Sequence, residues 1–127
     1  MSAREQFESK LSENLQQEVF ASSQTSETNV ATAGVFDGLL QALLDVLMDT
    51  VMNCMKQRTT SDIAKGLVNP GPLERWAIRE SVRNSEKIPS GQKKACQSAL
   101  QSTLKETDAN EMTAVLNELE LAKGWVI

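Results

Sequence analysis

Apolar side chains recur at every fourth position through the first part of the chain, at Phe7, Leu11, Leu15 and Val19. Positions four apart lie above one another on an α-helix, so these residues form one narrow apolar stripe on an otherwise polar helix. Ser2 and Glu5 have the spacing of a capping box, which predicts that the helix begins there. We expect this stripe to pack against a partner helix.

The composition changes between residues 21 and 33, where Ser, Thr, Gln and Ala dominate. Such a stretch lacks the large apolar residues that a buried segment needs, and it is typical of a linker. We therefore predict two parts: residues 1–33 as an amphipathic helical arm with its linker, and residues 34–127 as a helical domain. A tethered arm of this kind is an element that subunits exchange or zip together.

Residues 35–55 are the most apolar segment, and 14 of the 21 positions are Val, Phe, Leu, Ala, Met or Cys. The polar residues that interrupt the segment form one acidic stripe, which contains Asp37, Asp45 and Asp49. The free energy of inserting these three Asp into a bilayer is unfavourable by about 8–10 kcal/mol, whereas insertion of the apolar residues is favourable by only about 3–5 kcal/mol. We therefore predict no membrane span. A helix with so wide an apolar surface must be covered by protein, either by its own chain or by neighbouring copies.

Capping and helix-breaking residues place the remaining helices. The expected starts are Thr59 or Thr60, Pro72, Ser90 and Asp108. The expected ends are Gly66, about Arg83, and Gly124. No segment of useful length has the alternating pattern of a β-strand. The sequence therefore predicts an all-α fold, an irregular bundle of five or six helices around the central 35–55 helix, with an N-terminal helical arm.

Histidine is absent from the chain, and so is tyrosine. Without an imidazole, Ser-His-Asp catalysis, Cys-His catalysis and the His-containing zinc sites are excluded. Two cysteines cannot form a four-thiolate cage, and the sequence has no glycine-rich phosphate loop. We therefore expect no enzyme activity, no cofactor and no metal site.

Cys54 and Cys96 lie 42 residues apart without a CxxC motif, which favours two buried free thiols over a disulfide. Reduced cysteines are typical of the cytoplasm. The first residues contain no apolar signal-peptide core. We therefore expect a cytoplasmic protein, or one incorporated in a particle that assembles in the cytoplasm.

Charge is unevenly distributed along this acidic chain, whose formal net charge is -4. Residues 56–94 carry nine cations and four anions, and within them Arg75, Arg79 and Arg83 form an arginine stripe on one helix face. The acidic stripe has a similar spacing and the opposite sign. Pairing of the two stripes, within a subunit or between subunits, would set the register of packing. The alternatives are that the arginines contact phosphate groups or form a solvated helix face.

The last three residues of the sequence are all large and apolar. An exposed apolar terminus is unfavourable, so we expect these residues to dock on their own bundle or in a neighbouring molecule. Together with the first stripe they make up the predicted interface, which consists of Phe7, Leu11, Leu15, Val19, Trp125, Val126 and Ile127.

These patterns predict a non-enzymatic structural subunit that self-associates through apolar helix stripes, as in a phage or other large protein particle. Its expected partners are copies of itself or other protein subunits. One alternative is a nucleic-acid-associated regulator that uses the basic residues 56–94. Another is an adaptor or chaperone that binds a partner's helix beside Met48, Met52 and Met55.

Overall fold

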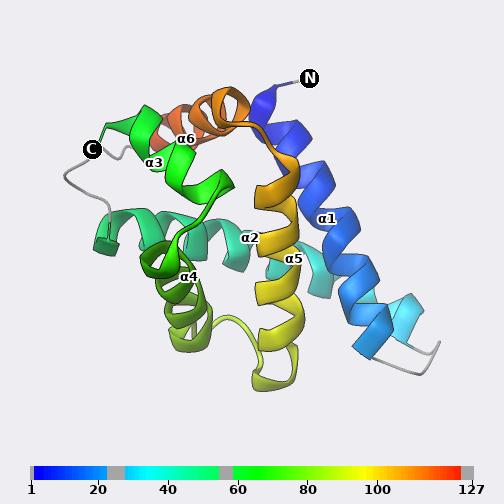
Figure 1. Cartoon of the computed structure of the whole chain (residues 1–127). Helices are drawn as coiled ribbons and strands as arrows, with labels where there is room; N and C mark the ends of the chain where they lie inside the picture. The colour runs from blue at the N-terminus through cyan, green and yellow to red at the C-terminus, as the bar shows by residue number, and fades with distance from the viewer. Residues whose placement is uncertain (1, 23–27, 55–58, 124–127) are drawn as a thin grey trace.

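Six α-helices follow one another in the part of the chain that the computed structural model describes, residues 2–22, 28–54 and 59–123 (Figure 1). They are α1 (Ala3–Ser22), α2 (Thr28–Cys54), α3 (Thr60–Val68), α4 (Pro72–Asn84), α5 (Lys93–Glu106) and α6 (Ala109–Lys123). A short 3₁₀ turn, η1 (Ser90–Gln92), precedes α5. The described residues contain no β-strand, so the predicted all-α helical bundle is confirmed.

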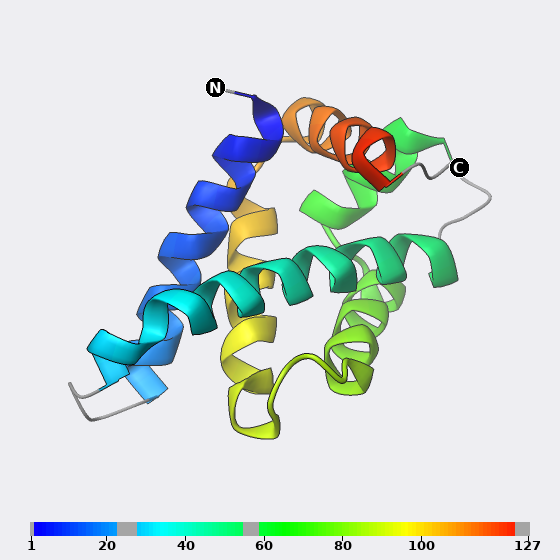
Figure 2. The ribbon, with the colours of Figure 1, turned by 180° about the vertical axis from the view of Figure 1, so that it is seen from behind.

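Helix α5 lies at the centre of the arrangement, where it packs against α1, α2, α3 and α4 (Figures 1 and 2). Helix α2 crosses one side of the bundle against α1 and α4, while α6 closes one end against α1 and α3. The prediction of a central 35–55 helix is therefore wrong. Its polar positions Asp37, Gln41 and Asp49 are exposed, and because charged groups are costly to bury, that side of α2 must face solvent.

Helix α1 does not project as an arm. All four residues of its apolar stripe are buried, with exposed fractions of at most 5%: Phe7, Leu11, Leu15 and Val19. They belong to one hydrophobic core that includes residues from each of the other five helices. The stripe packs mainly against α5 and α6 of its own chain. These four residues therefore stabilise the fold rather than lie on an exposed face.

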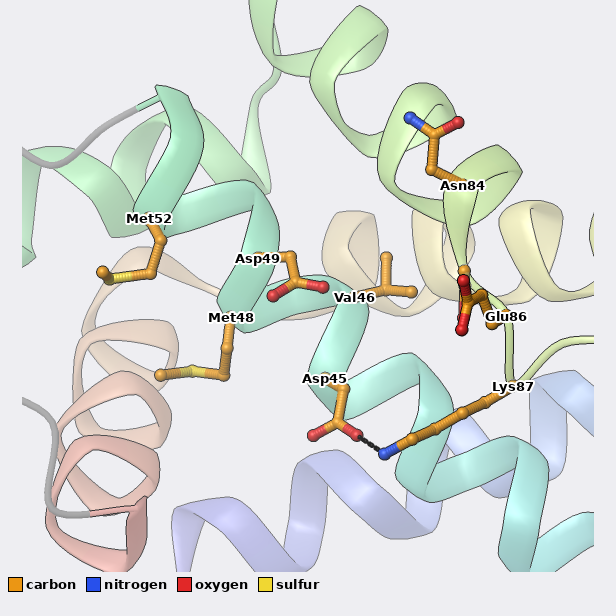
Figure 3. Close-up of a pocket in the computed structure, with 9 residues that line it drawn as sticks. Asp45, Val46, Met48, Asp49, Met52, Asn84, Glu86 and Lys87 are labelled. Atoms are coloured by element: carbon orange, nitrogen blue, oxygen red, sulfur yellow. Dashed lines mark hydrogen bonds and ion pairs between the residues drawn. The ribbon is translucent and has the colours of Figure 1, made fainter.

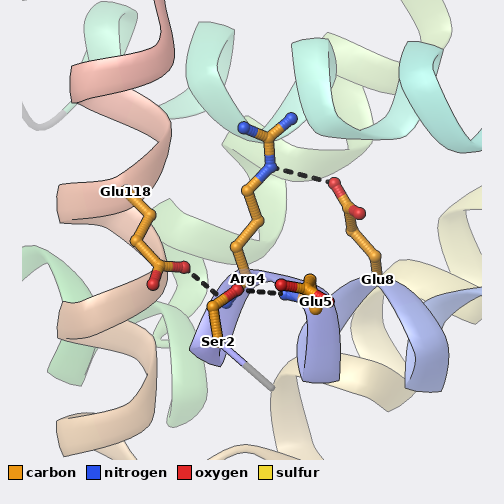
Figure 4. Close-up of polar contacts among 5 residues, drawn as sticks. All are labelled: Ser2, Arg4, Glu5, Glu8 and Glu118. Atoms are coloured by element: carbon orange, nitrogen blue, oxygen red, sulfur yellow. Dashed lines mark hydrogen bonds and ion pairs between the residues drawn. The ribbon is translucent and has the colours of Figure 1, made fainter.

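Polar contacts fasten the start of α1 to α6 (Figure 4). Ser2 Oγ accepts a hydrogen bond of 3.1 Å from the backbone N–H of Glu5, so the predicted start of the helix is confirmed. The backbone N–H of Arg4 donates to Glu118 Oε2 at 2.6 Å, and the Arg4 side chain pairs with Glu8 at 3.0 Å. A carboxylate at a helix N-terminus satisfies an unpaired N–H group and interacts favourably with the helix dipole. Glu118 thus caps α1 from a helix far along the sequence.

The apolar face of α2 is covered by its own chain between Leu39 and Val51. The buried side chains are Leu39, Ala42, Leu43, Leu44, Val46, Leu47, Met48, Thr50 and Val51. Thr50 satisfies its hydroxyl by donating to the backbone oxygen of Val46 at 2.8 Å. Of the two kinds of cover expected for this helix, its own chain or neighbouring copies, its own chain therefore supplies the cover for these residues. None of the described helices combines the length and the apolar composition needed to cross a bilayer.

Local capping signals place several helix starts correctly. Thr59 Oγ1 accepts from the Asp62 N–H at 3.1 Å at the start of α3. Asp108 Oδ1 accepts from the Glu111 N–H at 2.8 Å at the start of α6. Pro72 occupies the first turn of α4, where a backbone N–H group would have no hydrogen-bond partner within the helix, so its absence costs nothing. These three starts are confirmed because each depends on residues within one helical turn.

Other boundaries differ from the prediction. Gly66 lies inside α3, which continues to Val68, because a single glycine costs a helix only about 1 kcal/mol. Ser90 begins the 3₁₀ turn and makes no side-chain cap for α5. Helix α2 already begins at Thr28, within the segment predicted as a linker. Local signals thus place these three boundaries less accurately than the capped starts.

Candidate interaction surface between α2 and α4

Among residues 2–19, 37–52 and 59–119, whose burial the structure describes, three large apolar side chains are exposed. Met52, Leu73 and Trp76 have exposed fractions of 41%, 47% and 48%. Met52 lies near the end of α2, whereas Leu73 and Trp76 are three residues apart on α4 and therefore neighbours on that helix. Since α2 and α4 pack against each other, these three exposed side chains all lie on one helix pair.

Two adjoining hollows lie along the junction of these helices, and together we call them the α2–α4 groove. The larger has a volume of about 510 Å³ (Figure 3), and the smaller about 240 Å³. Both are lined by Asp49, Asn84 and Ser85. Met52 lines the larger hollow and Trp76 the smaller one. The groove therefore offers an apolar side chain in each hollow next to a shared carboxylate.

Carboxylates dominate the charge of the groove, which is lined by Asp45, Asp49, Glu80 and Glu86. Lys87 Nζ donates to Asp45 Oδ2 at 2.8 Å (Figure 3). This hydrogen bond raises the pKa of Lys87, and the charge of Asp45 and, more weakly, that of Asp49 raise it further. Lys87 thus stays protonated at neutral pH and offsets the charge of Asp45. Asp49 remains an exposed carboxylate in the middle of the groove.

The arginine stripe lies on the outer face of α4, where Arg75, Arg79 and Arg83 are all exposed. Arg83 Nη1 lies 3.5 Å from Glu80 Oε2, one turn earlier on the same helix. In the described part of the chain, no ion pair joins this stripe to the acidic stripe of α2. Pairing of the stripes within one subunit is therefore not seen, and pairing between subunits stays a prediction.

The other predicted site residues are Asp37 and the C-terminal residues 125–127. Asp37 is exposed on α2 but lines neither hollow. Trp125, Val126 and Ile127 lie outside the described residues, so their predicted docking stays a prediction.

Leu73 and Trp76 are both missing from the predicted interface, although the sequence contains a signal for Trp76. The buried positions of α4 are Ala77, Ile78 and Val82. Trp76 falls outside the stripe that these three residues form on a helix, whereas Leu73 lies one turn before Ala77, at the edge of the stripe. A large apolar residue outside the buried stripe of an otherwise polar helix indicates an exposed contact site.

The described side chains bear on two kinds of chemistry, metal binding and cysteine reactivity. No three Asp, Glu or Cys side chains of the described residues converge to hold a metal ion. Burial raises the pKa of the Cys96 thiol to about 11, so at neutral pH it is protonated and a poor nucleophile. The chemistry that the α2–α4 groove does offer is binding, through apolar contact and surface charge.

Comparison with known proteins returns no match: no protein-family model, no curated protein and no solved structure is significantly similar to this chain. The residues of the α2–α4 groove and their charges are therefore the basis for inferring a function.

Proposed function

We propose that this protein is a non-enzymatic structural subunit that self-associates through the α2–α4 surface, which comprises the α2–α4 groove together with Leu73 and Arg79. The observation that carries the proposal is the concentration of exposed large apolar side chains, Met52, Leu73 and Trp76, on one helix pair. Exposed apolar patches rimmed by polar residues mark protein interaction sites. Trp and Arg are enriched at the energetic centres of interfaces, and the flexible Met side chain adapts to its partner.

The charge distribution of this surface suits a second copy of the chain. Helix α2 presents the exposed Asp49, whereas α4 presents Arg79, which has no ion-pair partner in the described part of the chain. A two-fold axis that runs between the two helices would bring α4 of one subunit over α2 of the other. Each Arg79 would then face the partner's Asp49, and each Trp76 would pack near the partner's Met52. The same contact forms twice in the dimer, and in each contact a positive and a negative side chain face each other.

The same charges make a phosphate backbone a poorer ligand for this surface. Asp49 and Glu86 are exposed beside the arginine stripe, and the chain as a whole has a net charge of -4. Both features repel phosphate groups. Binding of a DNA duplex with a steep dependence on salt would instead favour the nucleic-acid alternative.

Trp76→Ala is expected to weaken self-association by at least about 30-fold, which corresponds to the loss of about 2 kcal/mol at an interface hot spot. Because Trp76 is half-exposed, the substitution is expected to leave the fold intact. Sedimentation equilibrium from low to hundreds of micromolar measures the association, and Gln17→Ala, an exposed truncation on α1, is the control. A monomer throughout this range for the unsubstituted chain would overturn the proposed function.

A charge exchange tests the orientation of the two subunits. In a two-fold dimer, Asp49→Arg alone and Arg79→Asp alone each place like charges opposite each other. Both variants are therefore expected to associate more weakly than the unsubstituted chain. In an equimolar mixture, a dimer with one subunit of each variant places unlike charges opposite each other at both contacts. We therefore expect the mixture to associate again. If each variant alone associates as strongly as the unsubstituted chain, the interface lies elsewhere. If both variants and their mixture stay monomeric, Asp49 and Arg79 do not face each other across the interface. Deletion of residues 125–127 then tests the predicted C-terminal contact.

A further inference from the structure

A third hollow is lined by residues of the connection between α3 and α4, of α4 and of α5, and we call it the connector pocket. Its volume is about 310 Å³, at the lower end of the range of small-molecule sites. Ile78 and Leu104 are buried and give it an apolar floor. Arg75, Gln101 and Lys105 supply polar groups around this floor. The pocket thus combines apolar contact area with a few hydrogen-bonding groups, as ligand sites do.

The charge of the connector pocket is uniformly positive. Arg75 and Lys105 both line it, no carboxylate does, and neither cation has an ion-pair partner within the described residues. Two cations that face one hollow repel each other, and an anion bound between them would remove that repulsion. The charge of this pocket therefore has the opposite sign to the charge of the α2–α4 groove and to the net charge of the chain.

We propose that the connector pocket binds a small organic anion, in which a carboxylate or phosphate group is joined to a short apolar body. The planar guanidinium of Arg75 offers paired N–H donors that match the oxygens of either group, and Lys105 adds a second positive charge. The Gln101 amide can donate a further hydrogen bond. The apolar body would lie against Ile78 and Leu104. The site is independent of the self-association proposed above, since the pocket shares no lining residue with the α2–α4 groove.

Titration of the isotopically labelled chain with hexanoate, followed by NMR, tests this proposal. We expect saturable shifts of the Ile78 and Leu104 methyl signals, with a dissociation constant in the millimolar range because the two cations are solvent-exposed. Hexanol, which has the same body without the charge, is expected to bind at least about tenfold more weakly. Inorganic phosphate, which lacks the apolar body, is also expected to bind more weakly than hexyl phosphate. Saturable binding of either hexanoate or hexyl phosphate supports the site.

Matched variants separate recognition from a general charge effect. Arg75→Gln and Lys105→Gln are each expected to weaken hexanoate binding about tenfold, the loss of one charge-assisted hydrogen bond. Arg79→Gln removes the same charge one turn further along α4 but does not alter the pocket lining, so we expect no change. Equal weakening by Arg75→Gln and Arg79→Gln would overturn the proposal. So would equal affinities for hexanoate and hexanol, or the absence of saturable shifts.

Discussion

Replacing Leu11 by Ala is expected to lower the free energy of unfolding by about 2–5 kcal/mol, the range for truncating a buried Leu. Leu11 has no exposed surface and lies in the middle of the α1 stripe, which packs against α5 and α6. A domain of this size has a total stability of only about 5–15 kcal/mol, so the variant loses a large share of it. Urea denaturation followed by circular dichroism measures the loss, at two protein concentrations so that association is not mistaken for folding.

The position of α1 in the core is what this experiment decides. Gln17→Ala changes an exposed side chain of the same helix, and we expect its stability to stay within about 0.5 kcal/mol of the unsubstituted protein. If α1 were a detached arm, Leu11→Ala would leave unfolding unchanged and would weaken only the contact with another molecule. That result would contradict the packing of α1 on α5 and α6.

Cys96 is expected to react with iodoacetamide at least about 100-fold more slowly in the folded protein than in urea, because the thiolate is the reactive form. Its side chain has no exposed surface, and burial raises the thiol pKa from 9.0 to about 11. Two pKa units alone lower the thiolate fraction at neutral pH by about 100-fold. Mass spectrometry of the proteolytic peptides separates Cys96 from Cys54. Labelling of Cys96 at equal rates in the two states would contradict its burial.

The same raised pKa of Cys96 makes stability depend on pH in the alkaline range. Below pH 9.0 the thiol is protonated in both the folded and the unfolded chain, so it contributes no pH dependence. Between pH 9.0 and about 11 the unfolded chain loses the proton first, and stability therefore falls as the pH rises. Urea denaturation at several alkaline pH values is expected to show a shallower fall for Cys96→Ala than for the unsubstituted chain.

Features that depend on neighbours within one turn of helix follow directly from the sequence. The caps at Ser2, Thr59 and Asp108 are of this kind, because in each the side chain accepts a hydrogen bond from a backbone N–H three residues later. The apolar spacing of α1 and the all-α class likewise follow from local periodicity. The end of α3 does not, because the packing of Leu67 into the core carries the helix past Gly66.

From the sequence, only the separate parts of the α2–α4 groove could be predicted, not their arrangement. The sequence shows two stripes of opposite charge and a Trp on a polar helix, but the ion pair of Asp45 is made by Lys87, which is 42 positions away along the chain. Met52 and Trp76 come to lie in adjoining hollows because α2 and α4 pack together. The spacing of residues along one helix does not indicate which other helix packs against it.

The sequence by itself determined the helical class, the capped helix starts and the absence of imidazole chemistry, since these depend on residue type and on spacings of a few residues. Only the tertiary structure decided that the α1 stripe is part of the core, that α5 rather than α2 lies at the centre, and that Met52 and Trp76 line hollows that both contain Asp49. An apolar stripe specifies that it must be buried but does not specify its partner. That choice depends on how six helices fill space together.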